Sequence, residues 1–189
     1  LSVNSTGNSN VAIGEYSLQY NTTGNNNTAT GYAALINNIT GYDNTANGFQ
    51  ALYNNTTGLG NTAIGKYSLF TSSVANENTA IGSYSLYANT SGYANTATGS
   101  YALESNTTGF NNTATGNSAL YANTTGIYNS AFGAGALSSN TTGSYNTAAG
   151  AGALSSSNGD DNSAFGYFSL YSNTTGAANT AIGSNALYA

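Results

Sequence analysis

One 17-residue phrase returns along the whole chain and constrains the fold more than any other feature of the sequence. Residues 61–69 read Asn-Thr-Ala-Ile-Gly-Lys-Tyr-Ser-Leu, and residues 78–86 and 95–103 repeat most of this phrase. An Asn-Thr-Thr-Gly turn separates most copies. A fixed period of this size is typical of an array whose units bury their apolar faces on one another.

The asparagine that opens each copy, the anchor asparagine, recurs eleven times. It stands at Asn10, Asn27, Asn44, Asn61, Asn78, Asn95, Asn112, Asn129, Asn146, Asn162 and Asn179. Every interval is 17 residues except the one from 146 to 162, which is 16 because residues 157–161 form a shorter turn. We assign 1–189 to a single repeat array. Because Leu1 is already in phase with the repeat, we expect a processed chain or a segment of a longer fibre.

The strict positions within each copy predict an all-β, parallel β-solenoid (β-roll) of about eleven coils. Two places after each anchor stands Ala, two places further on stands Gly, and four places after that Gly stands Leu. We expect Ala and Leu to face the inside of a thin coil and Gly to form a bend. The sequence predicts two short strands per coil, one over Asn-Thr-Ala-x and one around the Leu, as at 84–87. Stacking at about 4.8 Å per coil would give a rod roughly 50 Å long.

The composition excludes several classes of partner. Charged residues make up 4% of the chain, the net charge is −5, and Lys66 is the only base. We therefore expect no nucleic-acid partner, which would need a cationic face. No apolar run is long enough to cross a bilayer, so we expect no membrane insertion by this segment. The 22 aromatic residues argue against a disordered low-complexity tract.

No constellation of residues predicts an enzyme, a metal site or a cofactor site. The chain contains neither His nor Cys, which removes the usual nucleophile–base pairs. The paired carboxylates of Asp160 and Asp161 lie in the atypical turn, where no other acidic cluster complements them. We interpret them as a solvated loop.

The Asn-Thr-Thr-Gly turn and its variants place Asn-x-Thr/Ser sequons in one column. The candidate N-glycosylation sites are Asn4, Asn21, Asn38, Asn55, Asn89, Asn106, Asn123, Asn140 and Asn173, and the column is interrupted at Ser72 and Ser157. In a secretory pathway these turns would be exposed acceptors, and glycans would supply the solubility that the scarce charge does not. The alternative is that Asn-Thr-Thr-Gly is simply a good turn, in which Asn and Gly tolerate left-handed dihedral angles.

Aromatic residues gather mainly in three columns, of which the one directly after the Leu is expected to point outward. Its members, a candidate assembly or contact surface, are Tyr53, Phe70, Tyr87, Tyr121, Tyr171 and Tyr188. Outward tyrosines suit contacts between rods, packing against glycans or a receptor surface. Plain stacking between successive coils is the alternative.

Short forms of the phrase, such as Asn-Val-Ala-Ile-Gly at 10–14 and Asn-Ser-Ala-Phe-Gly at 162–166, carry a family resemblance. They resemble the head repeats of trimeric autotransporter adhesins of the YadA type. The full unit is similar to Asn-Thr-Ala-Ile-Gly arrays of phage tail-fibre-like and large bacterial surface proteins. The resemblance implies a left-handed parallel β-roll, often trimeric, outside the cell. The 17-residue units are longer than that family's usual 14, and polar residues such as Thr30 and Asn47 often replace the second apolar residue, which argues against a tightly packed apolar trimer seam.

These observations favour a structural extracellular fibre or filament subunit that associates with copies of itself. The alternative is an adhesin at the cell surface, a head or stalk that binds a receptor or a glycan. A third hypothesis, ice binding, rests on a column of threonines that resembles the flat threonine faces of β-solenoid ice-binding proteins. That column contains Thr28, Thr45, Thr62, Thr79, Thr96, Thr113, Thr147 and Thr180, and Asn47, Phe132 and Phe165 interrupt the columns beside it.

Overall fold

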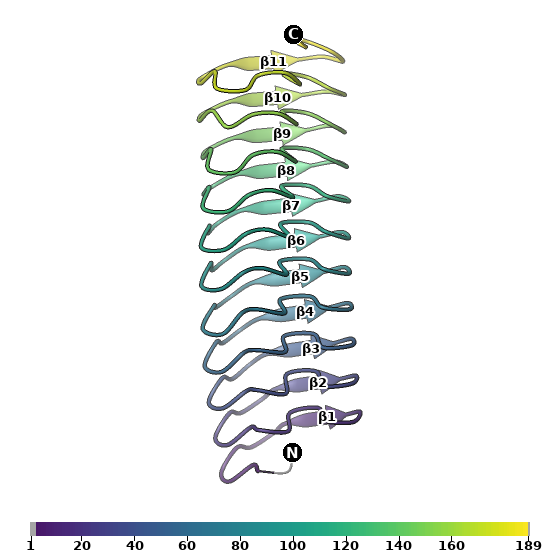
Figure 1. Ribbon diagram of the computed structural model, residues 1–189, viewed down its shortest axis with the longest axis vertical. Helices are drawn as coiled ribbons and strands as arrows, with labels where there is room; N and C mark the ends of the chain where they lie inside the picture. The colour runs from purple at the N-terminus through teal and green to yellow at the C-terminus, as the bar shows by residue number, and fades with distance from the viewer. Residues whose placement is uncertain (1–2, 189) are drawn as a thin grey trace.

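A computed structural model describes residues 3–188, so Leu1, which is in phase with the repeat leucines, lies outside the described residues. Eleven three-residue strands follow one another at the period of the repeat (Figure 1). They are β1 (Val11–Ile13), β2 (Thr28–Thr30), β3 (Thr45–Asn47), β4 (Thr62–Ile64), β5 (Thr79–Ile81), β6 (Thr96–Thr98), β7 (Thr113–Thr115), β8 (Ser130–Phe132), β9 (Thr147–Ala149), β10 (Ser163–Phe165) and β11 (Thr180–Ile182). The predicted all-β solenoid is confirmed.

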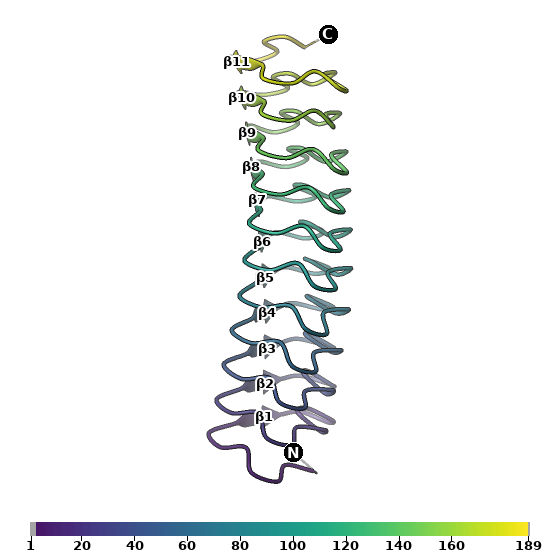
Figure 2. The same cartoon turned by 90° about the vertical axis from the view of Figure 1, so that its left-hand side faces the viewer.

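The strands form one parallel sheet in chain order, and the coils stack into a straight rod (Figures 1 and 2). Each alanine pairs with the alanine of the next coil, as Ala63 does with Ala80. The two flanking positions, such as Thr79 and Ile81 around Ala80, point outward because successive strand residues face opposite sides. The shorter coil keeps this register, with Ala148 opposite Ala164.

A glycine ends each strand because no side chain fits at that position. Gly82 has a φ of +136°. A Cβ added there would lie 2.5 Å from the carbonyl oxygen of Gly99, the equivalent glycine of the next coil. The predicted role of this glycine as a backbone bend is therefore confirmed. Close stacking of the coils is a second reason why a glycine is needed at this position.

The prediction of a second strand around the leucine is wrong, because each coil contains one strand. The leucine four places after each bend glycine has a positive φ, from Leu18 to Leu187, and so has the residue two places before it, as with Leu86 (49°) and Tyr84 (58°). This backbone still bonds to both neighbouring coils, since Leu86 N–H donates to Ala102 O and Tyr84 N–H donates to Lys66 O, each at 3.0 Å. The segment is thus hydrogen-bonded like a strand but lacks the extended dihedral angles of one.

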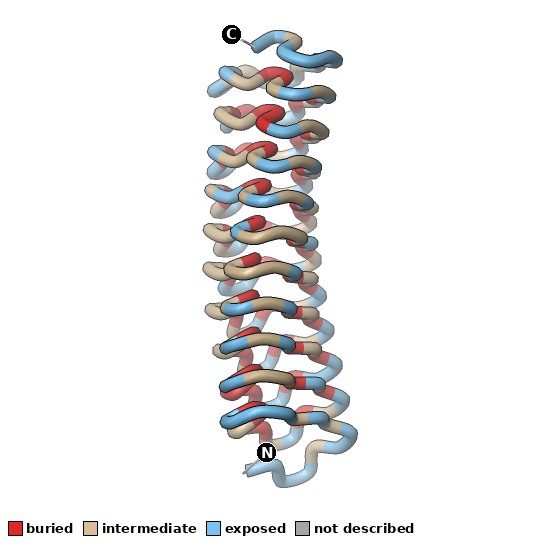
Figure 3. The backbone as a smooth tube through the Cα atoms, turned by 90° about the vertical axis from the view of Figure 1, so that its right-hand side faces the viewer, coloured by how far each residue is buried: buried red, intermediate tan, exposed pale blue. Residues whose placement is uncertain are grey.

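Burial of the leucine side chain compensates for its unusual backbone. A left-handed conformation costs a non-glycine residue roughly 1–2 kcal/mol. Full burial of a leucine contributes about 1.5–3 kcal/mol. From Leu18 to Leu154 the leucines at this repeat position have no solvent exposure, and they pack with the alanine column into one continuous core. Buried positions recur from coil to coil along the rod in Figure 3. The predicted inward Ala and Leu ladders are confirmed.

Candidate interaction surfaces

The interior of the rod contains two columns of asparagine side chains. In the first, the anchor column, each amide bonds to the coil before it and to the coil after it. Asn95 illustrates this pattern: its backbone N–H donates to Asn78 Oδ1 at 3.0 Å, and its Nδ2 donates to Asn78 Oδ1 at 3.1 Å. The same Nδ2 donates to Gly109 O at 2.9 Å. The backbone contact recurs from Asn27 to Asn179, including the shorter coil.

The second column, the turn column, consists of the sequon asparagines. Asn106 Nδ2 donates to Asn89 Oδ1 at 2.9 Å and to Gly109 O, the glycine of its own turn, at 3.0 Å. The expectation that these side chains are exposed is wrong for seven of them, which have no solvent exposure: Asn21, Asn38, Asn55, Asn89, Asn106, Asn123 and Asn140. Asn4 is exposed and Asn173 is half-buried.

Burial leaves no room for a glycan on these seven asparagines in the folded rod. A glycan would replace a hydrogen on an Nδ2 atom that lies inside the coil, as Asn106 Nδ2 does. N-glycosylation of the turn column stays a prediction only for a chain folded differently, or for Asn4 and Asn173 at the two ends of the column.

The glycine of each turn is required for space rather than for its dihedral angles, since its φ is not positive. A Cβ on Gly109 would lie 2.4 Å from Asn106 Oδ1 and 2.5 Å from Gly126 O. One turn, at residues 72–75, has an alanine instead, Ala75, and in that turn Ser72 replaces the asparagine. The asparagine and the glycine of a turn are therefore coupled by one steric contact.

Aromatic rings form a connected strip along coils 1 to 6, with neighbouring ring centroids 5.1–6.4 Å apart. This aromatic strip contains Tyr16, Tyr32, Phe49, Tyr53, Tyr67, Phe70, Tyr84, Tyr87 and Tyr101. The predicted columns missed Tyr32 and Phe49, which follow the bend glycine directly and continue the strip where the column two places after that glycine lacks aromatics.

Members of the predicted contact column lie on the outside of the rod, as alternation indicated. Tyr121 and Tyr188 are exposed, and Tyr53, Phe70, Tyr87 and Tyr171 are half-buried. Three neighbouring pairs of this column stack: Tyr53 with Phe70, Phe70 with Tyr87, and Tyr171 with Tyr188. In the Phe70–Tyr87 pair the ring centroids are 5.3 Å apart with an interplanar angle of 8°. The ring of Tyr121 contacts no other ring of the described residues.

A second strip, separate from the first, runs through coils 5 to 8. It contains Tyr93, Phe110, Tyr128 and Tyr145, whose successive centroids are 4.7–5.7 Å apart. These residues come one or two places before the anchor asparagine, on the other side of the turn from the leucine. A further cluster, Tyr167, Phe168, Tyr171 and Tyr188, lies at the last two coils.

Two charged residues, Lys66 and Glu15, interact with rings of the aromatic strip. Lys66 Nζ is 5.0 Å from the centroid of the Tyr67 ring, a cation–π contact. A hydrogen bond to Glu15 and the negative charge of that carboxylate raise the pKa of Tyr16 above its ordinary value. The strip is therefore an almost uncharged aromatic surface.

The outer face of the sheet carries two columns of hydroxyl and apolar side chains. Six consecutive threonines, from Thr28 to Thr113, stand in register in the first column. The second column mixes Ile, Thr, Asn, Phe and Ala, and the rings of Phe132 and Phe165 are exposed on it. Neither column contains a charged residue.

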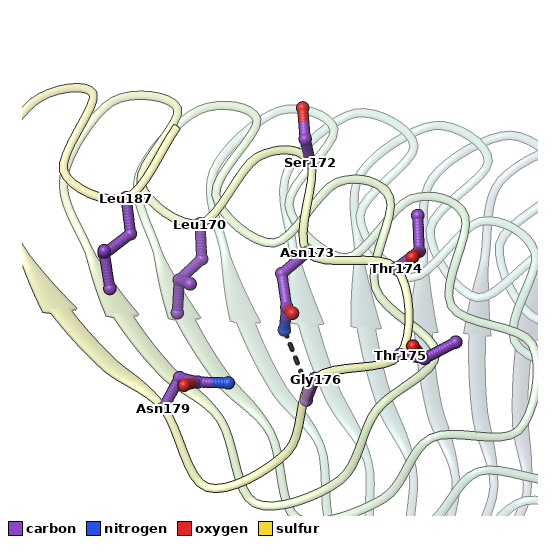
Figure 4. Close-up of a pocket in the computed structure, with 8 residues that line it drawn as sticks. All are labelled: Leu170, Ser172, Asn173, Thr174, Thr175, Gly176, Asn179 and Leu187. Atoms are coloured by element: carbon purple, nitrogen blue, oxygen red, sulfur yellow. Dashed lines mark hydrogen bonds between the residues drawn. The ribbon is translucent and has the colours of Figure 1, made fainter. Parts of the chain in front are cut away.

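Residues 3–188 include no group of three or more His, Cys, Asp or Glu side chains placed to hold a metal. Asp160 Oδ1 accepts a hydrogen bond from Ser144 N–H at 2.8 Å, and Asp160 and Asp161 are exposed. The hollow in Figure 4 is the open end of the coil between Leu170, Asn173 and Leu187. No helix that could span a bilayer occurs between residues 3 and 188.

Comparison of the chain with known protein families, with curated proteins and with solved structures gives no match. The interpretation of the surfaces therefore depends on the chain's own geometry.

Proposed function

We propose that the chain is a rod-shaped structural subunit of an extracellular fibre, and that copies of the rod associate laterally through the aromatic strip. The observation that carries the proposal is the nine-ring strip on a rod whose core consists mainly of packed alanine, leucine, serine and asparagine side chains. Aromatic side chains contribute large contact areas at protein interfaces, and charged residues are depleted at the centres of such interfaces. The resemblance to bacterial surface and tail-fibre repeats favours a location outside the cell.

Electron microscopy and sedimentation velocity of the purified chain test this proposal. A triple variant of the strip, Tyr67→Ser, Phe70→Ser and Tyr84→Ser, is expected to remain as single rods at concentrations where the parent chain forms bundles. The matched control changes the second strip by Tyr93→Ser, Phe110→Ser and Tyr128→Ser and is expected to bundle like the parent. Circular dichroism checks that both variants fold. Equal bundling of the two folded variants would exclude the aromatic strip as the contact.

The adhesin alternative receives less support from the ring geometry. A sugar packs on the free face of an aromatic ring, whereas Phe70 in the strip has Tyr53 and Tyr87 stacked on it at 5.1 and 5.3 Å. At Phe70, therefore, no ring face is free for a sugar, whereas the exposed Tyr121 contacts no other ring of the described residues and is the better candidate for receptor or glycan recognition.

Ice binding remains a second candidate because of the six in-register threonines on the sheet face. Parallel pairing repeats these hydroxyl and methyl groups at about 4.8 Å along the rod. Thermal hysteresis of the purified chain, compared with that of the double variant Thr62→Lys and Thr79→Lys, tests it. Absence of hysteresis in the parent chain at high concentration would exclude this function.

A further inference from the structure

The turn column is broken at Ser72, and the break leaves buried polar atoms without partners. Asn55 Oδ1 would accept from the amide nitrogen at position 72 if that residue were asparagine, as Asn38 Oδ1 accepts from Asn55 Nδ2 at 2.8 Å. Among the described residues, Asn55 Oδ1 and Ser72 Oγ have no hydrogen-bond partner, although both residues have no solvent exposure. A buried oxygen without a partner costs roughly 1–3 kcal/mol.

The atom missing at the break is a nitrogen that donates two hydrogen bonds. In an intact turn, Nδ2 donates once to the preceding asparagine and once to the carbonyl of its own turn, as Asn55 does to Asn38 Oδ1 and to Gly58 O at 3.1 Å. At the break the corresponding acceptors are Asn55 Oδ1 and Ala75 O, and the Ser72 hydroxyl can donate. A small neutral group with two donors and one acceptor would satisfy all three atoms.

We propose that a single water molecule is bound inside the rod at this break, in the place of the missing amide nitrogen. It donates to Asn55 Oδ1 and to Ala75 O, and it accepts from Ser72 Oγ. Buried waters typically make about three hydrogen bonds. Two of the three partners here, Asn55 Oδ1 and Ser72 Oγ, have no other partner among the described residues. The third, Ala75 O, also accepts from Asn61 Nδ2 at 2.8 Å, just as Gly109 O accepts from two asparagines.

The break at Ser157 has the same chemistry and provides a second, independent site. Asn140 Oδ1 is buried without a partner among the described residues. Ser157 Oγ accepts from Gly159 N–H at 3.3 Å, which leaves its hydroxyl hydrogen free to donate to a water. Here the turn retains its glycine, so no methyl group stands beside the site as Ala75 does at the first break.

A high-resolution crystal structure of the chain, together with oxygen-17 relaxation dispersion of water in solution, tests the proposal. The expected result is density within hydrogen-bond distance of Asn55 Oδ1, Ser72 Oγ and Ala75 O, and a long-lived internal water in the relaxation profile. The double variant Ser72→Asn/Ala75→Gly supplies the missing amide and the space for it, and is expected to lose one long-lived water.

Two results would overturn the proposal. One is a break closed by protein atoms, for example by a turned Asn55 amide, with no density at the site. The other is an unchanged number of long-lived waters in a folded double variant. If the double variant does not fold, the density in the parent chain decides by itself.

Discussion

The anchor column and the turn column are built from the same residue, yet only the anchor column runs unbroken through all eleven coils. Each anchor amide accepts a hydrogen bond from a backbone N–H of the next coil, as Asn95 Oδ1 does from Asn112 N–H at 3.0 Å. A turn-column amide bonds to a neighbouring amide and to a glycine carbonyl. That carbonyl already has a donor in the anchor column: Gly109 O accepts from Asn95 Nδ2 as well as from Asn106 Nδ2.

The comparison indicates that the cost of replacing an asparagine depends on which group loses its hydrogen-bond partner, a backbone N–H or a side-chain oxygen. Loss of an anchor amide leaves a buried backbone N–H unpaired, and such groups are almost always satisfied in native proteins. Loss of a turn-column amide leaves one side-chain oxygen unpaired, as with Asn55, because Ala75 O still accepts from Asn61 Nδ2 at 2.8 Å.

The largest effect is expected from Asn95→Ala in the anchor column. The substitution leaves the backbone N–H of Asn112 unpaired and creates a small cavity, so the free energy of unfolding should fall by roughly 2–4 kcal/mol. Urea unfolding followed by circular dichroism measures it. A loss below that of the turn-column variant described next would refute the ranking of the two columns.

A smaller loss, about 1–2 kcal/mol, is expected from Asn106→Ala in the turn column. This variant leaves Asn89 Oδ1 unpaired but no backbone group, since Gly109 O keeps its bond to Asn95 Nδ2. Asn95 and Asn106 lie in the same part of the rod, and both bond to Gly109 O. Urea titrations of the two variants under the same conditions therefore compare their losses in the free energy of unfolding directly.

Restoration of the broken turn should stabilise the rod only when two residues change together. Ser72→Asn alone should destabilise, because the new Oδ1 would overlap the Cβ of Ala75, as the contact between Asn106 Oδ1 and a Cβ on Gly109 indicates. The double variant Ser72→Asn/Ala75→Gly should gain about 0.5–1.5 kcal/mol. A double-mutant cycle measures the coupling between the two sites, and additive effects would contradict the steric explanation.

The smallest effect is expected from Ser157→Asn at the shorter turn. Gly159 follows Ser157 by two residues, whereas the glycine follows the asparagine by three in intact turns such as 106–109. The amide therefore cannot reach both of its usual acceptors, and we expect a change within about 0.5 kcal/mol. A gain equal to that of the double variant at 72 and 75 would show that turn length is not the cause of this break.

The sequence predicts the period, the parallel register and the inward Ala and Leu columns because each has one invariant residue at a fixed place. It does not predict the backbone around the leucine, since Tyr-Ser-Leu-Tyr is a good strand sequence by propensity. A signal was present: Gly135 and Gly152 occupy the position of Tyr84, and they share its positive φ. Glycine inside a supposed strand indicates an unusual dihedral angle.

Burial of the sequon column was missed because Asn-Thr-Thr-Gly follows ordinary turn chemistry, and turns usually lie on the surface. The turn at 72–75 indicates this burial, because Ser72 and Ala75 replace the asparagine and the glycine together. Such a joint replacement is expected when the two residues are in contact. The aromatic strip was found only in part, because Tyr32 and Phe49 belong to a different column from Tyr67. Rings of neighbouring coils can be in contact even when they stand at different positions of the repeat, as Phe49 and Tyr67 are.

Both asparagine columns also have a direction. Wherever two asparagines of one column are neighbours, the donor belongs to the later coil and the acceptor to the earlier one, as from Asn112 to Asn95 and from Asn106 to Asn89. The side-chain amides of these neighbours therefore point the same way along the rod, whereas the backbone hydrogen bonds between coils run in both directions. Aligned dipoles lying side by side attract when they run in opposite directions and repel when they run in the same direction. If the rods associate laterally as proposed, the asparagine columns would therefore favour antiparallel neighbours.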